Sequence, residues 1–530
     1  WLTRFGDHLP RALMVSDVPA LVHYYNGNDT LYRWEHLRAW LPPLGWWSLF
    51  FLMLMGTLMC LNVLVRQQWS DRERLTFPLT ILPLEITRPG PGGVSALFRS
   101  RLFWIGCGLA GGIDLVNGLN FLYPSVPAIP VKHIDLAPLL FRERPWSAMG
   151  WTPYSFYPFA IGLGYLLPLD LLFSCWFFYL YWKAQVVVAA SLGWDQLTQD
   201  FPFVKEQAFG GYMAVFVFAL WLSRRSWRGI WRRVLGRRSE LDDAREAISY
   251  RAALIGAVAG FVGVTGFFVW MGLPWWLAML SFGMYFALSL AINRIRAELG
   301  PPVHDMHFCG ADSILTRALG TTAFAPRELT AINFFWFFNR AYRSHPMPYA
   351  LEGLRMADRI GASQRVFFWA MALAVVIGMV ATFWAFLDHA YVDGTAGEFR
   401  SGYQKAQQAF SRLNSWFAAR QPANAPANWA LAIGFLCTGG LFLLRTHFLW
   451  FPLHPIGYAI SGSWSMNLVW LPLMIAWAAK LAILRYGGLR LYRHFIPFFL
   501  GLIVGESIVG CAWSLIGIVG DFPTYSFWGA

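Results

Sequence analysis

Residues 42–65 read PPLGWWSLFFLMLMGTLMCLNVLV, an apolar run without a single charged side chain. A helix needs about 20 such residues to cross the hydrocarbon core of a bilayer. The runs at 366–386 and 495–520 are also long enough and carry at most one charged residue each. The whole chain is 57% hydrophobic and 13% charged, whereas an ordinary soluble domain carries about 25% charged residues. We therefore predict an all-α, polytopic integral membrane protein.

The net charge of +13 is carried largely by arginines near the ends of apolar runs, and nine of them lie at 223–251. Positively charged loops stay on the cytoplasmic side, so this loop predicts topology and contact with anionic lipid. No aromatic-basic module accompanies it, so we do not expect nucleic acid as a partner. The expected location is the bacterial cytoplasmic (inner) membrane.

The apolar runs predict roughly ten to fourteen transmembrane or re-entrant helices. The clearest crossings are expected at 42–65, 102–122, 203–222, 252–271, 273–293, 366–387, 428–445, 466–484 and 495–519, together with an apolar stretch at 156–190 that Pro168 and Asp170 interrupt. Charged ends near Lys183 and Arg224 both look cytoplasmic, and further broken crossings at 184–202 and 449–461 would restore alternation.

The Arg-rich loop divides the chain into a first transmembrane half, 1–251, and a second half, 252–530. A mixed-charge loop at 388–427 is expected on the extracytoplasmic side. Within it, apolar residues recur at spacings of three and four, which predicts a helix lying on a surface. These residues are Tyr403, Ala406, Phe410, Leu413 and Phe417.

Two short apolar segments are interrupted by prolines in the two halves. LTFPLTILPLEI at 75–86 contains Pro78, and LWFPLHPIGYAI from 449 contains Pro452. Neither is long enough to span, and interrupted segments at matching places point to a transporter's binding site, because half-helix ends expose unpaired backbone groups. The match predicts an internal duplication, and coincidence in a chain rich in Leu, Phe and Pro is the alternative.

The segment at 75–86 resembles the Phe-Pro segment of the oligopeptide transporter family, which includes a branch that transports metal chelates. FFLGLIVGESIVG at 498–510 resembles that family's late Gly-Leu-Ile-x-Gly-Glu helix. The resemblance covers two patches, and the family's Asn-Pro-Gly signature is absent. It implies a fold of two inverted repeats and proton-coupled uptake of small peptides or metal chelates by a divergent bacterial relative.

Carboxylates at mid-membrane depth are functional candidates because insertion costs several kcal/mol. Asp114, Asp170 and Glu506 lie within apolar runs. The alternative is that each caps a broken helix or bonds to a neighbour. The resemblance favours a functional Glu506, as proton acceptor or partner of a substrate ammonium group. His454, in the second interrupted segment, is a candidate proton relay, with a local hydrogen-bonding role as the alternative.

The stretch PPVHDMHFCGAD at 301–312 gathers His304, Asp305, His307, Cys309 and Asp312. If it is helical, positions 304 and 307 share one face and 305, 309 and 312 another, so the five cannot converge on one ion. Paired ligands typical of a structural zinc site are missing. We interpret the stretch as a polar break that borders the pathway. An ordered cytoplasmic loop is an alternative, and His304, His307 and Cys309 are weak metal candidates.

These patterns predict a secondary transporter, not an enzyme, with no cofactor and no resident metal. Its expected partners are membrane lipids and a small-molecule or peptide solute, with a homo-oligomer or a larger membrane complex also open. The alternatives are a structural subunit of a membrane complex and a metal-dependent intramembrane enzyme, although HExxH, GxSxG and Walker lysine motifs are missing. Because the first residue is Trp, we expect that a leading segment is not included.

Overall fold

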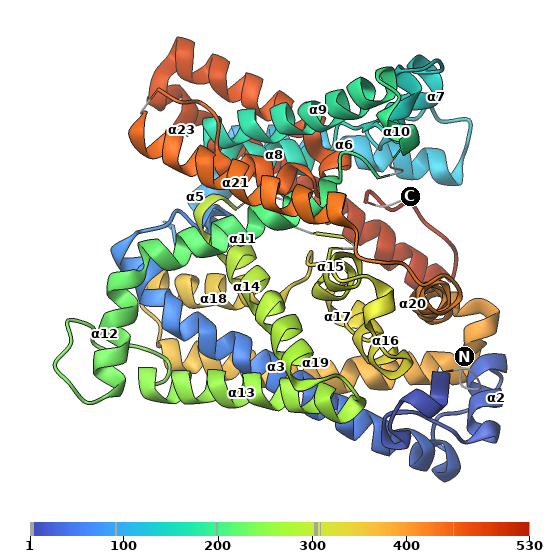
Figure 1. Ribbon diagram of the computed structural model, residues 1–530. Coiled ribbons are helices and arrows are strands. Elements are labelled where there is room, and N and C mark those ends of the chain that lie inside the picture. The colour runs from blue at the N-terminus through green and yellow to red at the C-terminus, as the bar shows by residue number, and fades with distance from the viewer. Residues whose placement is uncertain are drawn as a thin grey trace. The chain divides into compact units, whose positions relative to one another are not determined.

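The structure is a computed structural model that describes residues 5–90, 93–197, 200–300, 306–307, 309–448 and 450–528. Helices dominate these ranges (Figure 1). The one sheet among them pairs β1 (Ile134–Asp135) with β2 (Pro153–Tyr154) in antiparallel register. Eight of the described helices are long and apolar enough to cross a membrane. The prediction of a helical, polytopic membrane protein is therefore confirmed.

The chain folds into two compact units, each built from three stretches of sequence. Unit 1 comprises Trp1–Arg74, Ala219–Asn293 and Phe308–Asn428, and unit 2 comprises Leu75–Phe218, Arg294–His307 and Trp429–Ala530. The units do not coincide with the halves 1–251 and 252–530. The division into halves rests on a predicted repeat along the sequence, and it stays a prediction.

Unit 1 is built around the packing of α3 against α13, with α18 also packed on α3. The helices of unit 1 are α2 (Val18–Asn26), α3 (Trp34–Gln67), α12 (Arg224–Val234), α13 (Tyr250–Met271), most of α14 (Trp275–Leu299), α15 (Ala311–Ala318), α16 (Pro326–Asn333), α17 (Trp336–Asn339), α18 (Pro346–Ile360), α19 (Gln364–Asp393) and α20 (Arg400–Ala418). Short helical turns are η1 (Gly6–His8), η2 (Arg11–Leu13), η3 (Gln68–Arg72), η7 (Thr321–Ala323) and η8 (Gly394–Glu398).

Unit 2 is built around the last long helix, α23, which packs against α6, α8 and α9. The helices of unit 2 are α4 (Ile81–Thr87), α5 (Ala96–Arg99), α6 (Arg101–Leu122), α7 (Ala137–Leu140), α8 (Pro158–Leu166), α9 (Leu169–Ser191), α10 (Trp194–Leu197), most of α11 (Val204–Leu222), most of α21 (Ala425–His447), α22 (Pro455–Ser461) and α23 (Met466–Gly520), with the turns η4 (Pro78–Thr80) and η6 (Trp146–Met149). The last turn of α14, from Arg294, also belongs to this unit.

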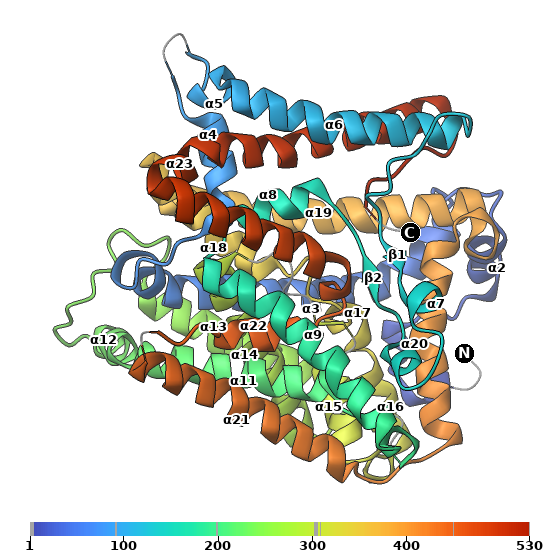
Figure 2. The same cartoon turned by 90° about the horizontal axis from the view of Figure 1, so that it is seen from above.

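The helix α23 is too long for one straight crossing, and it changes direction at Gly488. This residue has φ 61° and ψ −165°, a conformation that glycine adopts far more readily than other residues. The predicted crossings at 466–484 and 495–519 are the two arms on either side of this point. Figure 2 shows α6 alongside part of α23.

Most predicted crossings correspond to helices. The hairpin expected at 252–293 is formed by α13 and α14, which turn at Gly272 with φ 120°. The helix predicted around residues 403–417 is α20, which packs against α16. A separate crossing at 184–202 is wrong for the described residues there, because α9 continues to Ser191 and only the short α10 follows. Nothing between Lys183 and Ser191 interrupts a helix.

Candidate functional site

Two of the predicted membrane acids lie together inside unit 2. Asp114 projects from α6 and Glu506 from α23, and each is only 1% exposed. The two carboxyl groups are close enough to interact electrostatically. Glu506 Oε2 accepts the N–H of Phe159. Neither oxygen of Asp114 receives a hydrogen bond from any residue within the described ranges. We refer to Asp114 and Glu506 as the acid pair.

Glycines allow α6 and α23 to bring the acid pair together. A Cβ on Gly106 would lie 2.1 Å from the carbonyl oxygen of Phe498, and one on Gly501 would lie 2.2 Å from that of Phe103. Gly505, next to Glu506, meets the backbone of α6 in the same way. Small residues four apart permit such contact between membrane helices. The glycines of GLIVG at 501–505 therefore let α23 lie close to α6 next to Glu506 and Asp114.

A loop lysine and a tyrosine from the C-terminal segment surround the acid pair. Lys132 interacts electrostatically with Asp114, and its Nζ lies 4.5 Å from the ring centroid of Tyr525. Burial lowers the pKa of Lys132, and the charge of Asp114 acts in the opposite direction. Asn117 donates to the carbonyl oxygen of Ile129 at 3.0 Å and accepts its N–H at 2.7 Å. These bonds hold the loop that carries Lys132.

Asp170 belongs to a second polar group of unit 2, at the start of α9. It forms an ion pair with Arg445, near the end of α21. The break between α8 and α9 leaves the carbonyl oxygens of Tyr165 and Leu167 without helical partners, and Lys480 Nζ donates to them at 3.1 and 2.6 Å. The interruption that Pro168 predicted is therefore capped by a buried lysine of α23.

His454 is held by backbone and side-chain hydrogen bonds. Its N–H donates to Ser174 Oγ at 2.7 Å, and its Nδ1 accepts the N–H of Ile456 at 3.2 Å. His454 thus caps the start of α22, which fits the local hydrogen-bonding alternative. Asp170, Arg445 and Glu298 all lie close enough to interact with it electrostatically.

The two proline-interrupted segments both approach the last turn of α14. Phe77, which begins the turn containing Pro78, donates its N–H to the carbonyl oxygen of Ala297 at 2.9 Å. Thr76 Oγ1 donates to the carbonyl oxygen of Glu298 at 2.5 Å. Pro452 lies in the non-helical stretch before α22, two residues from His454, which interacts with Glu298. Unit 2 therefore brings the two segments to one helix end.

The polar break at 301–312 is described only in part. His304 and Asp305 lie outside the described residues. The ring of His307 contacts that of Trp464, with centroids 5.2 Å apart. Asp312 pairs with Arg412 of α20 inside unit 1, where it fastens α15 to α20. Among the described residues, neither His307 nor Cys309 belongs to a group of three ligands that could hold a metal.

A model of the family described as "Family of unknown function (DUF6785)" matches residues 1–529. The chain belongs to the DUF6785 family. Comparison with curated proteins found no match. The family's description names no activity.

Sequence reasoning missed several charged residues at the sites of this DUF6785 protein. Lys132, Lys480, Glu298 and Arg445 all contact or approach the predicted acids and prolines. Lys480 had a visible signal, since it is a charged residue inside the apolar run 466–484. Lys132 had none, because it lies in a loop whose fold the apolar pattern does not describe.

Proposed function

We propose that this protein is a secondary transporter, coupled to protons, that moves small peptides or metal chelates across the cytoplasmic membrane. The observation that carries the proposal is that the first proline-interrupted segment bonds to the last turn of α14, while His454 of the second lies close enough to Glu298 of that turn to interact electrostatically. In transporters, interrupted helices near charged side chains present unpaired backbone groups to the solute.

The acid pair supports a coupling role. Two carboxyl groups in one buried site cannot both carry a negative charge cheaply, so such a pair takes up a proton or a cationic group. Asp114, whose oxygens have no hydrogen-bond donor among the described residues, is the natural acceptor. Glu506, which is anchored by Phe159, would hold the partner position. Lys132 is placed to compete for Asp114 when the proton leaves.

The remaining parts of the proposal concern architecture and ancestry. We place this chain as a divergent bacterial relative of the oligopeptide transporters, with two inverted repeats. The bend of α23 at Gly488 supports counting its arms as two crossings, and the short segments near Pro78 and Pro452 as re-entrant pieces. Lipids and the solute are its proposed partners, and self-association or docking in a membrane complex is compatible with the same fold.

Uptake into proteoliposomes tests the proposal. Reconstituted full-length protein is expected to accumulate a labelled tripeptide or an iron(III) chelate under an inward proton gradient. Glu506→Gln should abolish accumulation, because Asp114 then loses the neighbouring negative charge that favours its uptake of a proton. The matched control is Glu240→Gln, which neutralises an exposed glutamate in the Arg-rich loop and should leave uptake intact.

The outcomes separate the competing functions. Gradient-driven uptake that survives in Glu506→Gln removes this residue from the mechanism. No uptake of either solute above that of empty liposomes contradicts the substrate class. A stable complex with other membrane proteins, seen in native gels together with absent uptake, would favour the structural-subunit alternative.

A further inference from the structure

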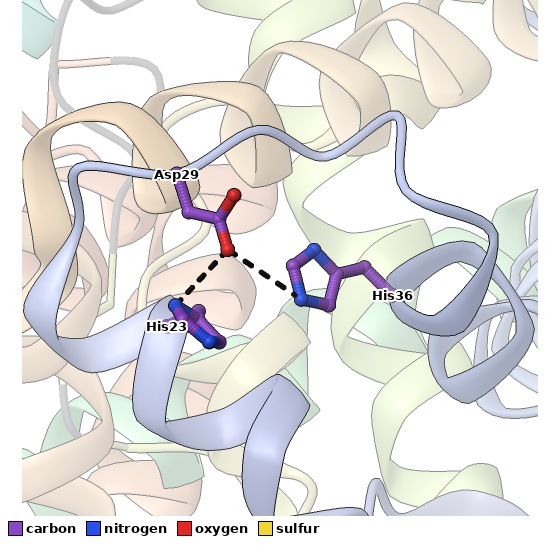
Figure 3. A group of neighbouring side chains, drawn as sticks. All are labelled: His23, Asp29 and His36. Atoms are coloured by element: carbon purple, nitrogen blue, oxygen red, sulfur yellow. Dashed lines mark ion pairs between the residues drawn. The ribbon is translucent and has the colours of Figure 1, made fainter.

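Two histidines and an aspartate converge near the start of unit 1, away from every residue used above. His23 lies on α2, His36 in the first turn of α3, and Asp29 in the loop between them. Figure 3 shows both imidazole rings directed toward the carboxylate of Asp29. Asp29 Oδ2 is 3.0 Å from His23 Nδ1 and 3.8 Å from His36 Nε2. One ligand atom from each residue lies within 4.8 Å of the others.

The backbone of the loop that carries Asp29 is fixed from both sides. Gly27 and Asn28 have φ of 73° and 58°, which turns the chain sharply after α2. The N–H groups of Asn28 and Asp29 donate to carbonyl oxygens at the end of α19, those of Val392 and Tyr391, at 2.9 and 3.0 Å. The arrangement therefore does not depend on the charges of the three side chains to hold it together.

The hydrogen bond at the far side of His36 decides how its ring is protonated. Its Nδ1 lies 2.9 Å from the carbonyl oxygen of Thr30, which can only accept, so Nδ1 carries a hydrogen. In the neutral ring, Nε2 then has a lone pair directed toward Asp29. The ring is held in this orientation by stacking on Tyr391, with centroids 4.5 Å apart and planes inclined by 20°. Such second-partner bonds orient metal-binding histidines.

Asp29 also directs one carboxylate oxygen toward the group. Its Oδ1 accepts the N–H of Thr30 at 2.8 Å, while Oδ2 receives no hydrogen bond of good geometry from the described residues. The side chain is 3% exposed. A buried carboxylate oxygen that faces an imidazole lone pair is stabilised by a positive centre, which here is a proton, the guanidinium of Arg33 or a metal ion.

The spacing and the donor types favour a metal ion. With metal–ligand bonds of about 2.0–2.1 Å, ligand atoms of a tetrahedral zinc site lie about 3.3 Å apart, and the two measured separations of 3.0 and 3.8 Å lie on either side of this value. Two imidazoles and one carboxylate suit Zn²⁺ and leave a position for water. His23 is 42% exposed, so the ion has access from solvent.

The guanidinium of Arg33 also lies close to Asp29 and would have to move when a metal ion binds. Arg33 Nη1 lies 3.1 Å from Asp29 Oδ2, but its side chain is 57% exposed and free to turn toward water. It would neutralise Asp29 while no ion is bound and would compete with an arriving ion.

We propose that His23, Asp29 and His36 bind one Zn²⁺ ion, which joins the end of α2 and the loop after it to the start of α3. This inference goes beyond transport and does not depend on it, since every residue involved belongs to unit 1.

Zinc uptake by the purified full-length protein tests the site. After treatment with a chelator and re-exposure to Zn²⁺, the protein should retain about one ion per chain by elemental analysis. His36→Ala should weaken binding at least about 100-fold in competition with a chromophoric chelator. His23→Ala should weaken it as well, and its exposed side chain makes misfolding a smaller concern. Gel filtration verifies that each variant is folded.

The chain supplies a matched control and a second readout. His389 lies 3.2 Å from Asp393 but has no third ligand among the described residues, so His389→Ala should bind zinc like wild type. Arg33→Gln should bind zinc more tightly, because the competing guanidinium is gone. Wild-type protein that takes up no more Zn²⁺ than His36→Ala, or an Arg33→Gln variant that binds more weakly, overturns the proposal.

Discussion

Arg66 connects three parts of unit 1 through its guanidinium group. It donates to both oxygens of Glu246, from Nε at 2.7 Å and from Nη2 at 2.6 Å. Its Nη1 donates to Asp358 of α18 at 2.7 Å. Arg66 and Glu246 are 4% and 1% exposed. The group therefore ties the end of α3 to the segment before α13 and to α18.

The first prediction concerns the loss of one partner of this arginine. Glu246→Gln should destabilise the protein by roughly 2 kcal/mol, because the guanidinium keeps Asp358 but loses its charged hydrogen bonds to the more buried carboxylate. Thermal unfolding in detergent measures the effect. The control Glu85→Gln removes an exposed pair with Arg88, whose atoms are 3.7 Å apart, and should cost less than about 1 kcal/mol. Equal unfolding midpoints for the two variants would contradict the expected role of Glu246.

Single residues differ in how far the sequence predicts their surroundings. Asp114 and Glu506 were identifiable because a carboxylate inside an apolar run must be buried. Their meeting depends on glycine contacts between α6 and α23, which hydrophobicity does not reveal. The group of His23, Asp29 and His36 was missed because it needs the left-handed turn at Gly27 and Asn28 to close it. The three residues lie on the end of one helix, a loop and the start of the next helix, so no single helical or strand face groups them in the sequence.

At the scale of elements, the contact between α6 and α23 leads to the second prediction. Gly501→Ala would place a methyl group against the carbonyl oxygen of Phe103, 2.2 Å away, so the helices must separate. We expect a loss of about 1–3 kcal/mol and a strong loss of uptake. Gly108 also lies on α6, but a Cβ added there would meet nothing within 4 Å. Gly108→Ala should therefore be neutral or slightly stabilising.

Thermal unfolding and uptake should be measured on both glycine variants. If Gly501→Ala unfolds like wild type, the close approach of α6 and α23 is not a tight constraint. If it is less stable yet transports normally, the separation of Asp114 from Glu506 does not limit transport.

Element boundaries were predictable where a breaker residue marks them. The turn at Gly272 and the interruption at Pro168 both lie where the sequence placed them. The predicted gap between 484 and 495 is instead helical on both sides of Gly488, because the arginines there do not oppose helix formation. The repeated Phe-Pro pattern predicted two short segments, and both are short, but the inverted repeat itself stays a prediction.

At the scale of the whole molecule, membrane topology leads to a further prediction. The Arg-rich loop should face the cytoplasm, and the loop containing α20 should face outward, since α19 is the crossing before it. In a variant without the six natural cysteines, Ala423→Cys should react with an impermeant maleimide added to intact cells. Glu240→Cys should react only after the membrane is opened. Labelling of both positions from outside would contradict this orientation.

The division into units was beyond the reach of the sequence. Apolar runs indicate which residues enter the bilayer, but they do not indicate which helices pack against each other. Each unit draws on early, middle and late stretches of the chain, so a cut after residue 251 passes through both units. The halves of the sequence and the spatial units are therefore different divisions of the chain.

The stretches of units 1 and 2 alternate along the chain, so unit 2 cannot be completed until its last stretch has been synthesised. The helix α6 leaves the ribosome long before α23, whose glycines complete its packing. During that interval, Asp114 has no Glu506 beside it. We therefore expect chains that end before α23 to be less stable in the membrane than chains that contain it, since the glycine contacts that complete the packing of α6 cannot form.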